Sequence, residues 1–302
     1  MSRTLLIDAP SLIYRAYYSA RGSDKVDMLA RACDLLDSII SEEMERPDFI
    51  VAAADDTDGY CVRRAIDPSY KLARRQEAQT PADLKAALPT VLRFFTDSLG
   101  IPVAHARGYE ADDVVASLAV HLEGQHRGTI LSTDRDLVAA VSPNVDLLLI
   151  SGSAVKHYDA ESAEQVFGVP PDRVHLFKGM VGDSSDGVAG VKGIGPKGAM
   201  PLIELARERG DSLADIRASA REHGRGGPYG RAGVLLLDGH QDFRTSVQLV
   251  RLHTDLDPRG DLHISAPLTR WDASNRQALR EIAIEARTER RLERAAASYA
   301  GA

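Results

Sequence analysis

Nine acidic side chains recur along the chain at positions that could form a metal-dependent catalytic site. They are Asp8, Asp56, Glu110, Asp112, Asp113, Asp134, Asp136, Asp183 and Asp186. Several follow a short apolar run typical of a buried strand, and the carboxyl ends of parallel strands meet in one crevice. Carboxylates gathered there would repel one another, and hard divalent cations would remove that penalty. The pattern therefore predicts a two-metal site for phosphodiester hydrolysis.

Each acidic group also has an ordinary structural interpretation when it is taken alone. The run 110–113 begins an amphipathic helix, where acids complement the helix dipole. Asp134 and Asp136 suit an N-cap and a first helical turn, and the run 183–186 suits a turn. The joint occurrence of these acids with others at several strand ends favours the metal site.

The composition indicates a folded protein of a reducing compartment. The chain has 302 residues, 44% of them hydrophobic, which is enough for one or two domains. Cys33 and Cys61 are too few for a disulfide framework, and no segment has the length of a membrane span. The formal net charge is −7, which the nine acids more than account for, so the total charge does not exclude a nucleic-acid partner.

Strand-like and helix-like segments alternate in the first part of the chain. The apolar runs that predict strands are residues 4–7, 49–54, 100–104, 129–133 and 145–150. Helical spacing is found at 28–40, from Thr80-Pro81 to about Leu99, and at 110–122. This order predicts a mainly parallel sheet covered by helices on both faces. Beyond residue 168 the pattern predicts mostly helices separated by glycine-containing turns, and residues 274–297 have a long helical pattern.

Residues 193–198 (GIGPKG) match the G-x-G-x-x-G pattern of dinucleotide-binding proteins. The motif follows a turn-like stretch and not a strand, which argues against a dinucleotide site. Pro196 suits the first turn of a helix, and the free amides of the glycine turn would face a phosphate of duplex DNA. A plain helix-turn-helix packing corner is the alternative. The candidate DNA-binding residues are Lys192, Gly193, Gly195 and Lys197.

Residues 61–75 have a local excess of cations, although most such runs are only solvated faces. Here Tyr70 stands beside Lys71, a pairing that suits stacking on an unpaired base and steering of the scissile phosphate. Arg15, on a helix that follows Asp8, is a weaker phosphate candidate. The candidate catalytic residues of this segment are Lys71, Arg74, Arg63 and Tyr70.

These motifs together resemble the 5′-nuclease (flap endonuclease) superfamily, and in particular the N-terminal 5′-3′ exonuclease domain of bacterial DNA polymerase I in stand-alone form. The first half of the resemblance consists of the strand ending at Asp8, Asp56 with Arg63 seven residues later, Tyr70-Lys71 with Arg74, and Gly108 to Asp113. The second half consists of Asp134 to Leu137 and Gly182 to Asp186, followed by Gly190 to Lys197.

The resemblance implies a PIN-like α/β core over residues 1–168, with a helical arch at about 59–83 through which a single strand passes. It implies a helix-three-turn-helix DNA-binding region over 169–260 and a C-terminal helical segment over 261–302 that packs on the core. It also implies two Mg²⁺ or Mn²⁺ ions, with a third held more weakly, and a K⁺ ion in the hairpin region.

The implied activity is structure-specific hydrolysis of DNA at 5′ ends, flaps or nicks by a cytoplasmic, nucleoid-associated monomer that serves replication or repair. The chain ends at Ala302, so a free-standing nuclease is expected. Gly187 and Ala189 replace an Asn and a Pro that the family usually has, and these changes are expected to loosen the hairpin. The alternatives are a PIN-type RNA nuclease, which does not need the hairpin, and a catalytically weak paralog that binds DNA structures.

Overall fold

The computed structural model describes residues 1–19, 25–56, 61–72, 81–122 and 126–284. A seven-stranded sheet in the order β6-β5-β4-β1-β2-β3-β7 lies at its centre. The strands are β1 (Ser2–Asp8), β2 (Phe49–Ala53), β3 (Val103–Ala106), β4 (His126–Ser132), β5 (Val145–Ser151), β6 (Ala154–Tyr158) and β7 (Leu262–Ile264). Strands β1 to β5 pair in parallel, which confirms the mainly parallel sheet, whereas β6 and β7 add antiparallel edges.

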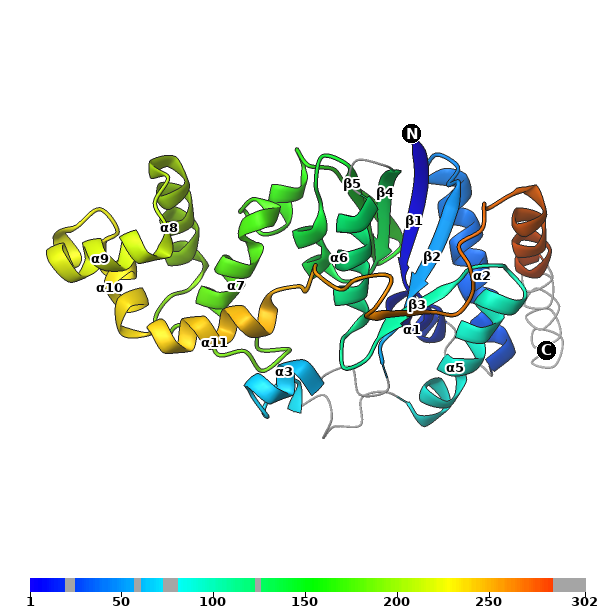
Figure 1. The fold of residues 1–302 in the computed structure, drawn as a ribbon, viewed down its shortest axis with the longest axis horizontal. Coiled ribbons are helices and arrows are strands. Elements are labelled where there is room, and N and C mark those ends of the chain that lie inside the picture. Colours follow the sequence, from blue (N-terminus) through cyan, green and yellow to red (C-terminus); the bar gives the residue numbers. More distant parts are fainter. Residues whose placement is uncertain (20–24, 57–60, 73–80, 123–125, 285–302) are drawn as a thin grey trace, which may run out of the picture.

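Helices cover both faces of the sheet (Figure 1). The helices of this part are α1 (Ala9–Ser19), α2 (Lys25–Glu42), α5 (Ala82–Asp97), α6 (Ala111–Leu122) and the short η1 (Arg135–Ala140). Leu5 and Ile7 of β1 pack with α1, α2 and α5, whereas Leu6 packs with α6 on the opposite face. Successive side chains of a strand point to opposite faces, so a continuous apolar run is what a strand buried on both faces requires.

The second part of the chain is helical and lies to one side of the sheet (Figure 1). Its helices are α7 (Val174–Val181), α8 (Pro196–Arg209), α9 (Leu213–His223), α10 (Gly230–Asp238) and α11 (His240–Val250), with short turns η2 (Ala163–Val166), η3 (Pro171–Arg173) and η4 (Gly224–Gly226). Helix α11 packs along α7 and reaches α3 (Cys61–Ile66). A final helix over 273–284 buries Leu279 against the α1–α2–α5 face. Among the described residues, no helix combines the length and apolar character needed to cross a bilayer.

The register of the parallel strands aligns the positions from which the acidic residues project. Asp8 lies opposite Ala53 of β2, and Ile7 lies opposite Leu131 of β4. The residues that follow β1, β2 and β4 therefore all leave the sheet at the carboxyl ends of the parallel strands, as the sequence predicts. Of the segment where an arch is expected, α3 and residues 67–72 are among the described residues, whereas Arg74 lies outside them.

Candidate active site

Five carboxylates from the ends of four strands form what we call the first group. Its members are Asp8, Asp55, Glu110, Asp112 and Asp134. Strands β1, β2 and β4 deliver Asp8, Asp55 and Asp134, whereas Glu110 directly precedes α6 and Asp112 lies in its first turn. Asp8 interacts electrostatically with Asp55 and Asp134, and Asp112 interacts with Asp8, Asp134 and Glu110. The structure therefore brings these five acids together at the carboxyl ends of the parallel strands.

Asp8 is buried at the centre of this group. Burial raises its pKa to about 7, although hydrogen bonds from the Ser132 hydroxyl (2.6 Å) and the Ser11 amide (3.2 Å) oppose the shift. The negative charges of Asp55 and Asp134 act in the same direction as burial. Ionisation of the Asp8 carboxylate therefore has an electrostatic cost, and a bound cation would reduce this cost.

Asp112 and Asp55 share this electrostatic environment. Burial, followed by repulsion from Asp8 and Asp134, raises the pKa of Asp112 well above its ordinary value. Burial also raises the pKa of Asp55, against the hydrogen bond that its carboxylate accepts from the Ala111 amide (2.8 Å). Asp8, Asp55 and Asp112 therefore resist ionisation together, or require positive charge nearby.

The structure places Asp56 and its neighbour Asp55 in different surroundings, and the assignment of Asp56 as a metal ligand stays a prediction. The Asp56 carboxylate accepts a hydrogen bond from the Gly108 amide (3.0 Å) and faces His105 at 4.0 Å. The neighbouring Asp55 is the residue that interacts with Asp8 and Glu110. The seven-residue step to Arg63 favoured Asp56 in the sequence, whereas Asp55, two residues beyond the end of β2, is the acid that interacts with the first group.

Glu110 is surrounded by cations and a phenol. It accepts hydrogen bonds from Arg63 (2.8 Å) and Tyr70 (3.0 Å), and it pairs with the Lys71 ammonium. Burial opposes ionisation of Lys71, but Glu110 and other negative groups outweigh it and hold its pKa well above the ordinary value. Tyr70 is only 3% exposed, so the expectation that its ring stacks on an unpaired base is wrong for this conformation.

Asp113, predicted as a metal ligand, is fully buried and is held by Arg63. Both Arg63 end nitrogens donate to the two Asp113 oxygens (2.6 and 2.7 Å), and the His253 amide donates a further bond (2.9 Å). Arg63 also donates to the Leu249 carbonyl at the end of α11 (2.8 Å). The Arg63–Asp113 pair therefore ties α3, α6 and α11 together and orients Glu110 beside it.

The remaining acids, Asp136, Asp183 and Asp186, form the second group, and a lysine that the sequence analysis missed lies within it. The Lys178 ammonium of α7 pairs with Asp136 and lies 2.7 Å from Asp183. Burial would lower the pKa of Lys178, but Asp136 and Asp183 outweigh it and raise the pKa. Burial opposes ionisation of Asp183, yet hydrogen bonds from Lys178 and Ser185 hold its pKa far below the ordinary value. The sequence feature that could have indicated its role is that Lys178 is the only charged residue in the apolar run 176–181.

Asp186 joins the second group to the first through Lys71. The Lys71 ammonium lies 3.9 Å from the Asp186 carboxylate, and the Lys71 amide donates to the Asp186 carbonyl (2.9 Å). Lys71 adopts a left-handed φ of 51°, which a non-glycine residue rarely does. Gly187, at φ 75°, lies against this turn, because a Cβ there would be 3.3 Å from the Ser69 carbonyl.

The donor set fits hard divalent cations by its chemistry, since it consists of partly or fully buried carboxylates that repel one another. Within the described residues, however, no three Asp, Glu, His or Cys side chains already form a ligand shell. Several of the carboxylates have cation partners instead: Lys71 pairs with Glu110, and Lys178 pairs with Asp136 and Asp183. Binding of a metal would require these carboxylates to exchange ammonium partners for the ion.

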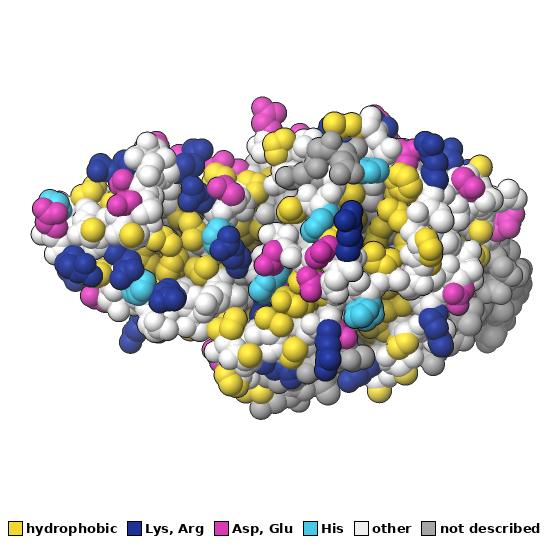
Figure 2. All heavy atoms as spheres, viewed as in Figure 1, with side chains coloured by type: hydrophobic (Ala, Val, Ile, Leu, Met, Phe, Trp, Pro, Cys, Tyr) yellow, Lys and Arg dark blue, Asp and Glu magenta, His cyan; other side chains and the backbone are white. Residues whose placement is uncertain are grey.

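The glycine hairpin has the geometry that the sequence predicts. Helix α8 begins at Pro196 after Gly195, and Gly193, two residues before Gly195, has a φ of 89°. Lys192 and Lys197 are exposed on either side of the turn. Many further Lys and Arg side chains cover the lobe of α8 to α11 (Figure 2). Arg15, by contrast, donates to the Gly152 carbonyl at the β5–β6 turn.

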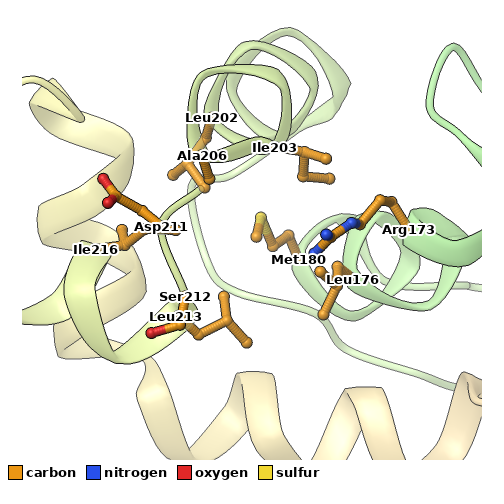
Figure 3. Close-up of a pocket in the computed structure, with 10 residues that line it drawn as sticks. All are labelled: Arg173, Leu176, Met180, Leu202, Ile203, Ala206, Asp211, Ser212, Leu213 and Ile216. Carbon is orange, nitrogen blue, oxygen red and sulfur yellow. The ribbon is translucent and has the colours of Figure 1, made fainter. Parts of the chain in front are cut away.

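A small pocket between α7, α8 and α9 lies apart from the acidic residues (Figure 3). Leu176 and Met180 of α7 face Leu202 of α8 across it, so its walls are largely apolar. Its one carboxylate, Asp211, already accepts hydrogen bonds from Arg209 (3.0 Å) and Tyr229. This pocket lacks the groups that phosphodiester chemistry needs.

Two family models match consecutive parts of the chain. The model described as "5'-3' exonuclease, N-terminal resolvase-like domain" matches residues 3–168. The model described as "5'-3' exonuclease, C-terminal SAM fold" matches residues 169–292.

Individual relatives agree with these models. The chain is 30% identical to a 5′-3′ exonuclease of Aquifex aeolicus over 276 residues, which cover 88% of each protein. It is 32% identical to the flap endonuclease Xni of Cronobacter sakazakii, over 82% of this chain and 98% of that one. It is 30% identical to DNA polymerase I of Chloroflexus aurantiacus over 91% of this chain, but that match spans only 29% of the polymerase.

Solved structures share the fold. The T5 D15 protein, crystallised with metal ions, superimposes with a TM-score of 0.67 at 19% identity, over 83% of this chain and 90% of that one. The catalytic core of Rad2 in complex with DNA substrate superimposes with a TM-score of 0.55 at 18% identity, over 94% and 92%. This likeness confirms the expected α/β nuclease fold.

Proposed function

Because the two family models together match residues 3–292, this chain belongs to the 5′-3′ exonuclease family, and we propose that it hydrolyses DNA phosphodiester bonds at 5′ ends, flap junctions and nicks. The observation that carries the proposal is the gathering of five acids at the ends of four strands, with raised pKa values at Asp8, Asp55 and Asp112. Relatives named as a 5′-3′ exonuclease and a flap endonuclease support the same class of reaction.

Two divalent cations, Mg²⁺ or Mn²⁺, would be held by the two groups of carboxylates, with a third ion bound more weakly. The first group would hold one ion and the second group the other, since oxygen ligands of this kind suit both metals. When bound, such ions lower the pKa of water and stabilise the charge that develops on the reacting phosphate. Asp55 takes the place of Asp56 in this assignment, and Asp113 serves as the anchor of Arg63.

The side chains of this protein would position the substrate around the metal ligands. The Lys71 ammonium lies between Glu110 of the first group and Asp186 of the second, so it is placed to draw the scissile phosphate toward both. Arg63 and Tyr70 act by orienting Glu110 through their hydrogen bonds. A role for Arg74 stays a prediction.

Duplex DNA would lie along the hairpin at residues 192–197. The amides of the glycine turn and the exposed Lys192 and Lys197 suit a backbone phosphate, and carbonyls of the same turn would hold the expected K⁺ ion. The arch at about 59–83 would receive the single strand. The division into a core (1–168), a DNA-binding region (169–260) and a C-terminal segment (261–302) is proposed on the same basis, as is a monomeric state.

Cleavage of a 5′-labelled double-flap DNA with Mn²⁺, Mg²⁺ or EDTA tests the proposal. We expect metal-dependent cutting near the junction, and its loss in Asp134→Asn, which keeps an acceptor for the Asp136 amide (2.8 Å). Asp146→Asn is the matched control, because Asp146 is a buried acid of β5 that pairs with Arg127 and His157 outside both groups. Normal cutting by Asp134→Asn would show that the active site is elsewhere.

A parallel reaction with single-stranded RNA separates the proposed activity from that of an RNA nuclease. The exposed glycine hairpin favours DNA as the substrate, since cleavage of single-stranded RNA does not need it. Preference for RNA would overturn the substrate class while leaving the metal chemistry intact. Tight binding of the flap DNA without cutting under any metal would indicate a binding protein.

A further inference from the structure

Lys178 is a buried cation that the proposed mechanism does not use. It lies in the helix Val174–Val181, between Phe177 and Gly179, and is only 6% exposed. A lysine is rarely buried to this extent unless it is paired, because removing an ammonium group from water is costly. Its location therefore needs an explanation in terms of the groups that it contacts.

The contacts of Lys178 are two carboxylates from different parts of the chain. Asp136 begins the turn after β4, and Asp183 follows the end of α7. The ammonium pairs with Asp136 and lies 2.7 Å from an oxygen of Asp183, whose other oxygen accepts from the Ser185 amide (2.9 Å). Lys178 therefore bridges the two acids at the position where a divalent ion of the second group would have to bind.

We propose that the Lys178 ammonium competes with a divalent cation for Asp136 and Asp183 and so keeps the second metal site weaker than the first. The inference rests on the proposed function, because it assigns a role to the ligands of that same site. Lys178 acts here as a positioning residue: it holds the two carboxylates together and neutralises part of their charge. In the first group, by contrast, the direct cation contacts described are those of Arg63 and Lys71 with Glu110.

A purely structural ion pair predicts a different result from the proposed competition. If Lys178 only allows the acids to be buried, its removal destabilises the protein and leaves metal affinity unchanged or lower. If it competes with the ion, its removal leaves two carboxylates without their cation, and a divalent ion then binds there more tightly. Metal affinity measured without DNA separates the two interpretations.

The test compares Lys178→Met, which keeps the length of the side chain, with Lys178→Arg, which keeps the charge. Lys156→Met, at an exposed position of β6, is the control for loss of one positive charge. Mn²⁺ binding is measured on the DNA-free proteins from the electron paramagnetic resonance of the unbound ion. We expect the second dissociation constant to fall at least about tenfold in Lys178→Met and to stay near the wild-type value in the other two variants. An unchanged or weaker second site in Lys178→Met would overturn the proposal.

Thermal unfolding provides a readout if Lys178→Met is too unstable to purify without metal. A ligand that binds only the folded state raises its stability as the ligand concentration increases. We expect Mn²⁺ to restore the folding of Lys178→Met, with a larger shift in Tm than in Lys156→Met, and an equal or smaller shift would contradict the proposal. Absence of any tight Mn²⁺ site in the wild-type protein would instead count against the proposed function, so the two failures are distinguishable.

Discussion

The two groups of carboxylates are built in opposite ways. The first group collects acids from the ends of parallel strands, and burial and mutual repulsion raise the pKa values of Asp8, Asp55 and Asp112. The second group joins the end of the sheet to the helical region, and Lys178 neutralises part of its charge. The pKa of Asp183 is accordingly held low although burial opposes this, whereas burial and Asp134 keep the pKa of Asp136 raised in spite of Lys178.

This difference indicates that a bound metal ion would stabilise the two groups to different degrees. The first group carries an electrostatic cost in the folded protein, which a divalent ion would remove. The second group already has a cation in place, so an ion there would replace an existing interaction. Removal of the Asp112 charge from the first group and of the Asp183 charge from the second should therefore change the stability of the metal-free protein in opposite directions.

The largest expected effects come from comparing Asp112→Asn with Asp183→Asn in EDTA at pH 8. Asp112→Asn removes a repelled charge and should raise the free energy of unfolding by on the order of 1 kcal/mol. Asp183→Asn weakens the pairing of Lys178 and should lower it by about 1–3 kcal/mol, less than for a fully buried pair because the Asp183 side chain is 16% exposed. Urea unfolding measures both changes.

The rate of flap cleavage by Asp112→Asn tests the comparison of the two groups through activity as well as stability. We expect Asp112→Asn to lose at least about 100-fold in cleavage rate despite its greater stability, because it removes a proposed metal ligand. A drop in both stability and activity would indicate that Asp112 supports the fold rather than the chemistry. Equal stability changes in the two variants would remove the distinction between the groups.

The pH dependence of stability without metal is a second way to test the first group. The pKa of Asp8 is about 7 in the folded protein and near 3.8 in the unfolded chain, so folding takes up a proton between these values. Its contribution to stability is complete below pH 4 and is lost as the pH rises through 7. We expect about 1–2 kcal/mol of this contribution to disappear between pH 5 and 8.

The control for this measurement is Asp8→Asn, because another group titrates in the opposite sense. Burial lowers the pKa of His175 to about 4, so its contribution to stability is lost as the pH falls below 6.5. The difference between wild type and Asp8→Asn cancels the His175 effect. An equal pH slope in the two proteins would show that Asp8 is already ionised without metal.

The sequence predicts the sheet well because its physical signal is local. Each of the strands β1 to β5 is an apolar run, since parallel strands are buried on both faces. Strands β6 and β7 were missed, because β6 is largely exposed and β7 has only three residues. Both lie at edges of the sheet, where pairing depends on neighbours distant in sequence and no apolar run is required.

The site could be predicted as a set of acids but not as a set of contacts. Spacing in the sequence places acids at strand ends, yet it could not distinguish Asp55 from Asp56, which differ only in how the chain leaves β2. It also could not show that Arg63 would hold Asp113, or that Lys178 would reach Asp136. These contacts join segments from 42 to 50 residues apart, so only the packing of α3, α6 and α7 determines them.

The smallest expected effect concerns Gly187, which lies where the two groups meet. The sequence suggests that its departure from the family pattern loosens the hairpin, but the structure places it against the turn that carries Lys71. In Gly187→Asn the new Cβ would lie 3.3 Å from the Ser69 carbonyl, so that turn must shift by a few tenths of an ångström. Asn tolerates a positive φ, and the loss of stability should therefore stay below about 1 kcal/mol. We expect single-turnover cleavage to slow a few-fold while the affinity for flap DNA is unchanged. Weaker DNA binding with an unchanged cleavage step would show that Gly187 acts on the hairpin after all.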